Sequence, residues 1–320
     1  MDGETLTRGL LYLSLAVLGI PGNTLMILAF LLMLHRESRL LPADAIILHL
    51  SVANLSVVGV RCVLETLATF RLVNVFNNAG CKGVIFVYRT SRALSIWLTF
   101  VLSTYQCLSI APPGSFWSSV RSLFGRYLWV VFLMVWIINI SVSVPAALFS
   151  VGVKNDSKLM ENSINVQFCL VSFPSAYVKD VNGAAQTVRD VVPMTMMTTA
   201  SLIILVFLYR HSRQVRGLRG TGSQGGGASA ERRAAVTVVT LVLLYLLMYG
   251  VDNGLWVYTL SVKQTLSSAL VSDLRIFFSS LFAAISPIVI IGSNKKLKKQ
   301  LRGEREEKPP PAPETTLSTV

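Results

Sequence analysis

Seven long runs of apolar residues dominate the chain, and short polar segments separate them. Each run is about 20 residues or longer, the length that a helix needs to cross the hydrocarbon core of a bilayer. Backbone groups inside a bilayer must be hydrogen-bonded within the chain, so we expect each run to be a transmembrane helix. The predicted fold class is therefore an all-α membrane protein, a seven-transmembrane helix bundle. The expected spans are Leu10–Leu34, Pro42–Leu67, Gly83–Ile110, Tyr127–Val151, Thr187–Tyr209, Ala234–Leu260 and Leu270–Gly292.

The composition of the 320-residue chain supports this prediction. Hydrophobic residues make up 52% of it and charged residues only 14%, whereas soluble domains carry about 25% charged residues. A soluble enzyme, a disordered chain and a small disulfide-rich scaffold are thereby excluded. The sequence contains no HExxH, Walker or GxSxG motif, so we expect no enzymatic activity, no metal site and no cofactor.

The net charge of +13 is informative through its position along the chain. Seventeen of the 29 Lys and Arg residues fall in segments on one side of the membrane, and six fall on the other side. Positive residues accumulate on the cytoplasmic side, so we expect the C-terminus inside the cell and the N-terminus outside. The charge therefore indicates topology rather than binding to nucleic acid. The predicted organisation is a short extracellular N-terminus at residues 1–9, a seven-transmembrane domain at residues 10–292, and a basic, proline-rich cytoplasmic tail at residues 293–320.

Two of the four cysteines are expected outside the membrane. Cys81 lies at the outer end of the third span, and Cys169 lies in the long loop between the fourth and fifth spans. Both positions face an oxidising compartment, which favours a disulfide between them over two free thiols. In the same loop, Asn155 begins an Asn-Asp-Ser acceptor for N-glycosylation.

Several local motifs resemble those of rhodopsin-like G-protein-coupled receptors. The first span contains Gly22-Asn23, and the fourth contains Trp136 at the usual place of a tryptophan. Pro193 and Pro287 stand where the fifth and seventh helices of such receptors carry proline. Together these residues resemble the signature of that superfamily.

Other motifs of the superfamily are altered, and the alterations form a pattern of their own. The third span ends in Tyr105-Gln106-Cys107 where a DRY-like triplet is expected, and Asn54 replaces the sodium-binding Asp of the second span. The seventh span lacks the Asn and Tyr of NPxxY, and the sixth lacks its usual proline. This pattern resembles vomeronasal type 1 receptors and the fish "ora" olfactory receptors related to class A. The segments that carry the resemblance are HLSVAN (His49–Asn54), CKGVIFVYRTSRALSIWLT (Cys81–Thr99), LSTYQCLSIAP (Leu102–Pro112), YGVDN (Tyr249–Asn253) and SPIVI (Ser286–Ile290).

This resemblance covers about residues 10–297. It implies a chemosensory receptor of the plasma membrane that binds a small pheromone or odorant and activates a heterotrimeric G protein. A bitter-taste receptor is the nearest alternative, disfavoured because that family typically lacks the outer-loop disulfide pair and the CK…YR…R pattern. A membrane transporter is a second alternative: intramembrane charges suit it, but the sequence shows neither repeated halves nor broken helices. A receptor-like protein that no longer couples also stays open, because the DRY and NPxxY features are missing.

Charged residues within the predicted spans indicate a functional site, because they are costly in a bilayer. Arg61 and Glu65 are one helical turn apart and can pair, and Asp252 of the sixth span is within reach of Arg92 of the third. We interpret these groups as a polar ligand pocket in the outer half of the bundle. The structural alternative is an ion-pair network that only orients helices, and the Arg92–Asp252 pair could also be a switch that ligand binding breaks. The predicted ligand-binding residues are Tyr88, Arg89, Arg92, Glu65, Arg61, Asp252, Ser279 and Ser280.

The balance of charge inside the spans suggests a ligand class. Six basic residues lie within or at the ends of spans, against four acidic residues. This excess favours an acidic or phenolic small molecule, because arginine binds a carboxylate through two parallel hydrogen bonds. Arg89 is the residue that we assign to such a ligand. Lys82 and Arg189 lie near the water boundary and are predicted to extend toward water instead.

The predicted cytoplasmic face is basic. Because the DRY arginine is missing, contact with the G protein is expected at Gln106 and at arginines of the inner loops; the alternative is that these arginines only set topology. The stretch Lys295–Arg302 is expected to lie on anionic lipid, and Ser318–Val320 fits the C-terminal ligand of a PDZ domain. The predicted G-protein-facing residues are Gln106, Arg121, Arg126, Arg213, Arg216, Arg232 and Arg233.

Overall fold

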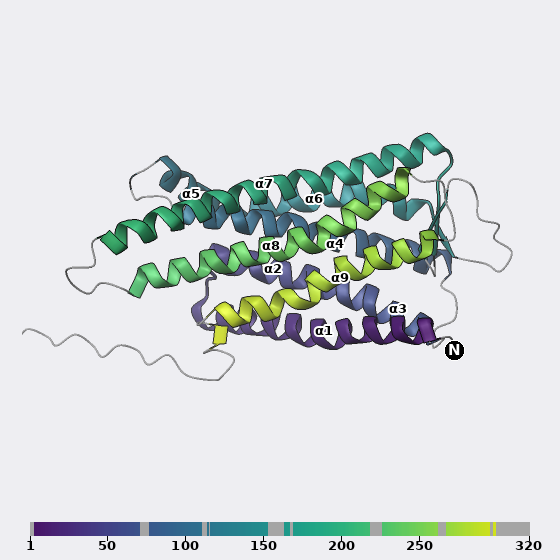
Figure 1. The fold of residues 1–320 in the computed structure, drawn as a ribbon, viewed down its shortest axis with the longest axis horizontal. Coiled ribbons are helices and arrows are strands. Elements are labelled where there is room, and N and C mark those ends of the chain that lie inside the picture. The colour runs from purple at the N-terminus through teal and green to yellow at the C-terminus, as the bar shows by residue number, and fades with distance from the viewer. Residues whose placement is uncertain are drawn as a thin grey trace, which may run out of the picture.

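Seven helical rods lie side by side along the long axis of the molecule (Figure 1). The computed structural model describes residues 3–70, 77–110, 114, 116–152, 163–166, 169–217, 226–261, 267–294 and 297–298. The second rod is a continuous run of three elements, and each of the others is one helix. The rods are α1 (Gly3–Glu37), α2 (Pro42–Val57) with η1 (Val58–Cys62) and α3 (Val63–Thr69), α4 (Asn78–Ser109), α6 (Leu128–Leu148), α7 (Ala176–Gly217), α8 (Gly226–Ser261) and α9 (Ser267–Ser293).

The rods coincide with the predicted spans. Among the described residues, six rods are long and apolar enough to cross a membrane, and α9 contains a shorter apolar helix, Ile276–Gly292. Each predicted span lies on one rod, apart from Ile110 at the end of the third span, Tyr127 at the start of the fourth and the last residues of the fourth span beyond Leu148, and this confirms the all-α seven-helix bundle. The structure differs mainly at α7, which begins at Ala176 instead of Thr187.

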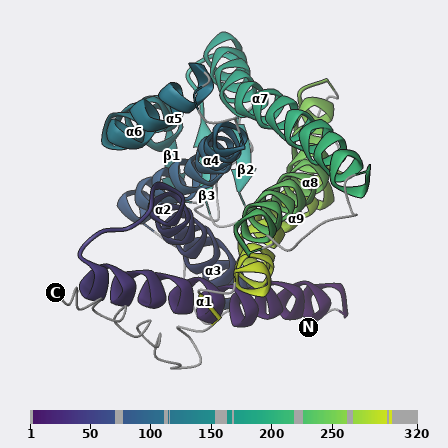
Figure 2. The same ribbon diagram turned by 90° about the vertical axis from the view of Figure 1, so that its left-hand side faces the viewer.

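α4 is the central helix of the bundle. It contacts α2, α6, α7 and α8, and Figure 2 shows it surrounded by the other rods. Of its most apolar window, 56% is buried inside the protein, compared with 28% for α6. More than half of this window of α4 therefore faces protein groups rather than lipid.

The second rod contains a π-helical turn, η1, between α2 and α3. A π turn widens the helix locally and is frequent at functional sites. It carries Arg61, whose side chain is fully buried. Regular α-helical spacing would place Asn54 and Arg61, which are seven residues apart, on one helix face, and η1 interrupts that spacing.

A small antiparallel sheet covers one end of the bundle. Its strands are β1 (Ser150–Gly152), β2 (Ser163–Val166) and β3 (Cys169–Ser172), in the order β1-β3-β2. Val171 of the central strand pairs with Ser150 on one side and Ile164 on the other. The sequence analysis did not predict this sheet, because its strands are short.

A disulfide fixes the sheet to the start of α4. It joins Cys81 to Cys169, whose Cα atoms are 5.7 Å apart, and this is the pair that the sequence analysis expected. The Asn78 side chain also accepts a hydrogen bond from the backbone N–H of Gly152 at 2.9 Å. The N-terminus lies at the same end (Figure 1), which we call the disulfide end.

The opposite end of the bundle carries a further helix that the sequence analysis did not predict, α5 (Phe116–Arg126) (Figure 1). It leads into α6 with only Tyr127 between them. The ring centre of Phe124 on α5 lies 6.2 Å from the ring centre of Tyr105 on α4. We call this end of the bundle the α5 end.

Some predicted features lie outside the described residues. They are the glycosylation acceptor Asn155, most of the tail at residues 293–320 with its PDZ ligand, and the side chains of Arg213, Arg216, Arg232 and Arg233.

Candidate functional site

Arg92 is the centre of a buried charge cluster that joins three helices. Its Nη1 donates to Oδ2 of Asp190 on α7 at 2.5 Å, and its Nη2 donates to Oδ2 of Asp252 on α8. The Arg92 side chain is 11% exposed, and the two carboxylates are 4% and 3% exposed. One guanidinium therefore binds two carboxylates, and α4, α7 and α8 are joined through it.

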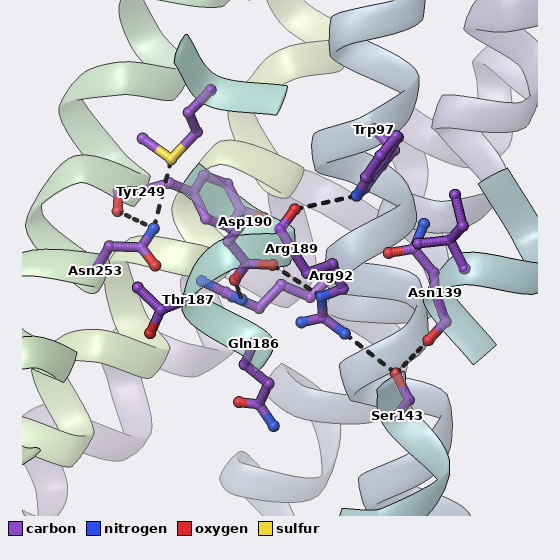
Figure 3. A network of polar contacts seen from close by, with 12 residues as sticks. Arg92, Trp97, Asn139, Ser143, Gln186, Thr187, Arg189, Asp190, Tyr249 and Asn253 are labelled. Carbon is purple, nitrogen blue, oxygen red and sulfur yellow. Dashed lines mark hydrogen bonds and ion pairs between the residues drawn. The ribbon is translucent and has the colours of Figure 1, made fainter. Parts of the chain in front are cut away.

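Asp190 also pairs with its neighbour Arg189, so the cluster extends to α6 (Figure 3). The Arg189 Nε donates to Asp190 Oδ1 at 3.0 Å, and its Nη1 donates to the Ser143 hydroxyl at 3.3 Å. The backbone carbonyl of Arg189 accepts from the Trp97 indole N–H at 3.2 Å. Two positive and two negative side chains thus balance in this cluster, as a low-dielectric site requires.

Aromatic rings form one wall of the charge cluster. The Arg92 guanidinium carbon lies 5.1 Å from the ring centre of Tyr249, within the range of a cation–π contact. Tyr245 stacks on Tyr249 at 4.2 Å, and Phe282 of α9 meets both rings edge-on. Neither tyrosine hydroxyl has a hydrogen-bond partner among the described residues, although both side chains are buried.

A second polar cluster lies on the disulfide side of the first. Glu65 of α3 pairs with Arg61 at 3.3 Å and also with Arg8 of α1. The Arg61 guanidinium carbon lies 5.6 Å from the ring centre of Tyr88, and the Tyr88 and Ser279 hydroxyls are 2.9 Å apart. This cluster therefore joins α1, the second rod, α4 and α9.

The two clusters meet on one face of α4. Tyr88 and Arg92 are four residues apart, so their side chains are neighbours on the helix surface. Ser95, less than one turn further along, donates to the Asn54 side chain at 2.7 Å, and Asn54 donates to Ser286 at 2.9 Å. A column of polar groups thus follows the middle part of α4 from Tyr88 to Ser95.

Comparison with known proteins identifies the family. A family model described as "Vomeronasal organ pheromone receptor family" matches residues 7–303. This chain belongs to the vomeronasal type 1 receptor family. It is 39% identical over 302 residues to "Olfactory receptor class A-like protein 1" of Danio rerio, an alignment that covers 94% of this chain and 93% of the relative. It is 25% identical over 286 residues to "Vomeronasal type-1 receptor 1" of Homo sapiens, an alignment that covers 89% and 80%.

Family membership confirms several predictions at once. The protein is a chemosensory receptor of the G-protein-coupled type and a multi-pass protein of the plasma membrane, and its family is not enzymatic. The resemblance proposed from the sequence is therefore correct over nearly the whole chain. The bitter-taste and transporter alternatives are set aside by the same match.

The structure brings together most of the residues that the sequence analysis assigned to a receptor pocket. Six of the eight take part in the contacts described above, and Arg89 and Ser280 remain. Arg89 is half-buried on α4, less than one turn from Arg92. Ser280 is fully buried on α9 beside Ser279.

Three charged residues of the clusters were not predicted as site residues. Asp190 was one of the four acidic residues counted inside the spans, and Arg8 was one of the six basic residues counted on the outer side. The prediction that Arg189 extends toward water was wrong, because its side chain is 3% exposed and points into the cluster. The neighbouring residues Arg189 and Asp190 carry opposite charges, and that pairing inside an apolar span was the signal available in the sequence.

The structure describes the side chains of three of the predicted G-protein-facing residues. Gln106 is half-buried in the last turn of α4, and Arg121 and Arg126 are exposed on α5. The neutral Gln106 occupies the DRY position of α4, and Arg92, earlier on the same helix, forms ion pairs with α7 and α8.

Proposed function

We propose that this receptor binds a small chemosensory ligand at the polar face of α4, between the disulfide end and the middle of the bundle. The observation that carries this proposal is the Arg92 cluster, in which one buried guanidinium joins α4, α7 and α8. Intramembrane ion pairs of this kind are costly and mark functional sites. A ligand that competes for one partner of Arg92 would change how three helices are held together.

The unsatisfied groups at the cluster support this location. The buried hydroxyls of Tyr245 and Tyr249 have no partner among the described residues, and a buried polar group without a hydrogen bond costs about 1–3 kcal/mol. A polar ligand that accepts from either hydroxyl would recover that cost. The aromatic rings around them would contact the apolar body of the same ligand.

The charges of the two clusters favour an acidic or phenolic ligand. Together with Arg89 they contain five arginines, namely Arg8, Arg61, Arg89, Arg92 and Arg189, and three carboxylates, namely Glu65, Asp190 and Asp252. Among these eight described side chains the positive charges exceed the negative charges by two, and the carboxylate of a ligand would reduce that difference. We assign Arg89 to contact with that acidic group.

We further propose that the disulfide end faces the outside and the α5 end faces the cytoplasm. The excess of basic residues in the segments at the α5 end supports this orientation. Ligand binding at the α4 face would then be transmitted to a heterotrimeric G protein at Gln106 and at the basic residues Arg121, Arg126, Arg213, Arg216, Arg232 and Arg233. An epitope fused to the N-terminus tests the orientation: antibody staining of intact cells supports it, and staining only after permeabilisation contradicts it.

A signalling assay tests the ligand proposal. The full-length receptor would be expressed with a promiscuous G-protein alpha subunit, and intracellular calcium would be recorded against small acids, phenols, amines and steroids. We expect a saturable response to an acid or a phenol that R89A removes without loss of surface expression. K82A is the matched control, because Lys82 is a basic, exposed residue of the same helix face. An acid response that is the same in R89A as in the unmodified receptor would refute the role of Arg89.

A further inference from the structure

α5 is an amphipathic helix whose apolar face points away from the bundle. Phe116, Trp117 and Leu123 are 74%, 58% and 57% exposed, and no residue of the helix is buried. A helix that packs on a protein core buries its apolar face instead. Helical spacing places Phe116, Val120 and Leu123 together, on the side opposite Arg121, Ser118 and Gly125.

The polar face of α5 borders a cavity at the α5 end of the bundle. Its volume is about 450 Å³. The lining is rich in hydrogen-bond donors: one guanidinium, two serine hydroxyls and one tyrosine hydroxyl. The lining residues are Pro42, Tyr105, Ser118, Arg121, Ser122 and Gly125.

The charge of this cavity is positive. No lining residue is acidic, and Asp44, the acidic residue in the first turn of α2, is 8% exposed and does not line the cavity. Within the described residues Arg121 makes no ion pair. An arginine combined with hydroxyl donors is a typical binding set for a phosphate group.

Exposed aromatic residues follow α5 at the start of α6. Tyr127 and Trp129, at the start of the membrane span α6, are 47% and 66% exposed, and tyrosine and tryptophan are enriched where a bilayer meets water. α5 therefore lies at the depth of the lipid headgroups, with its apolar face turned away from the cavity.

We propose that the cavity between α2, α4 and α5 binds the phosphomonoester headgroup of an anionic lipid, and that the apolar face of α5 inserts into the same leaflet. Arg121, which is also among the proposed G-protein-facing residues, contacts the phosphate when no G protein is bound, and the hydroxyls of Ser118, Ser122 and Tyr105 complete the hydrogen bonds. Anionic lipids concentrate in the cytoplasmic leaflet, so this inference rests on the proposed orientation of the receptor. It is independent of the identity of the chemosensory ligand.

Lipid retention by the full-length receptor in nanodiscs tests this inference. One set of discs contains phosphatidylcholine with phosphatidic acid, and a second contains phosphatidylserine at the same total negative charge. Bound lipid is titrated by native mass spectrometry for the unmodified receptor, R121Q and R126Q. Arg126 is the matched control, because it is an exposed arginine of the same helix that does not line the cavity.

We expect phosphatidic acid to bind more tightly than phosphatidylserine at equal charge. R121Q should weaken retention about tenfold, the effect of one lost hydrogen bond to a charged group, and R126Q should stay within about twofold. S122A removes one hydroxyl donor from the cavity and should weaken retention by a smaller factor. It serves as the second variant if R121Q lowers the yield of folded receptor.

Four results would overturn the inference. They are equal weakening by R121Q and R126Q, equal binding of the two anionic lipids, binding of free inorganic phosphate as tight as that of phosphatidic acid, and no retention of phosphatidic acid by the unmodified receptor. If the last result came with loss of G-protein coupling in R121Q, the cavity would be a protein contact instead. The N-terminal epitope distinguishes the two possible causes of a negative result. If antibody cannot reach the epitope on intact cells, the proposed orientation is wrong; if antibody reaches it, the proposed lipid site is wrong.

Discussion

Replacing Arg92 by Met removes a side chain that joins α4 to both α7 and α8. Met has a similar length but no charge, so Asp252 loses its ion pair with Arg92, and Asp190 keeps its ion pair with Arg189. Removing one partner of a buried ion pair costs about 3–5 kcal/mol. With roughly 2–4 °C of Tm per kcal/mol for a chain of this size, we expect R92M to lower the Tm of the purified receptor by about 6–20 °C.

Adding a second substitution to R92M tests which residues of the cluster pair with each other. R92M/D252N leaves Arg189 and Asp190, which are already paired at 3.0 Å, so the cluster is neutral again and should recover about 1–3 kcal/mol. R92M/D190N has the same net charge but leaves Arg189 and Asp252, which do not pair with each other in the structure. It should recover much less than R92M/D252N.

The assay is thermal unfolding in detergent, followed by intrinsic fluorescence. Surface expression of each variant in cells serves as a second readout of folding. Equal recovery by the two double variants would refute the pairing that the structure shows, because only net charge would then matter. A Tm for R92M within a degree or two of the unmodified receptor would refute the energetic role of the cluster altogether.

Two further predictions concern packing and the disulfide. A Cβ at Gly19 would lie 3.0 Å from the Cα of Ala284 on α9, so G19A should lower the Tm through about 1–3 kcal/mol of overpacking. G59A is the control and should leave the Tm unchanged, because a Cβ at Gly59 would have nothing within 4 Å. Equal effects of the two substitutions would contradict the close approach of α1 and α9. C81S opens a disulfide whose cysteines are 88 residues apart, and this loss can lower the free energy of unfolding by at most about 4–5 kcal/mol. We therefore expect C81S to reach the cell surface less than the unmodified receptor, and C81S/C169S to reach it as much as C81S. Undiminished surface expression of C81S would show that the bundle holds the sheet without the disulfide.

The helices could be predicted from the sequence because a membrane-spanning segment must be long and apolar, and both properties can be read directly from the residues. A run of about 20 apolar residues has few stable conformations other than a transmembrane helix. The π turn at Val58–Cys62 left no such signal, because one extra residue per turn changes neither the length nor the polarity of the run. α5 was missed because its apolar positions are few and its length is only 11 residues; the spacing of Phe116, Val120 and Leu123 was the signal that could have found it.

The site was predicted where contacts are local and missed where they depend on packing. Arg61 and Glu65 are neighbours on one rod, so their spacing alone predicts the pair that the structure shows. Asp190 and Asp252 reach Arg92 from two other helices, and only Asp252 was anticipated. Which face of α7 turns toward α4 depends on the crossing of the two helices, and no pattern within α7 encodes that crossing.

For the signalling function proposed above, the polar column on α4 offers a physical reason why a charged DRY triplet would not be needed. In the described residues, the ion pairs that tie α4 to α7 and α8 are located at Arg92, about one-half of the way along the helix, instead of at the α5 end, where Gln106 is neutral. A ligand near Tyr88 therefore lies one helical turn from the constraint that it has to change. In a receptor with the charged group at the cytoplasmic end, the same ligand would have to act through the length of the helix. The Arg92 variants bear on this point as well as on stability, because relaxing the cluster should change ligand-independent signalling, whereas G19A, which perturbs α1 and α9, should not.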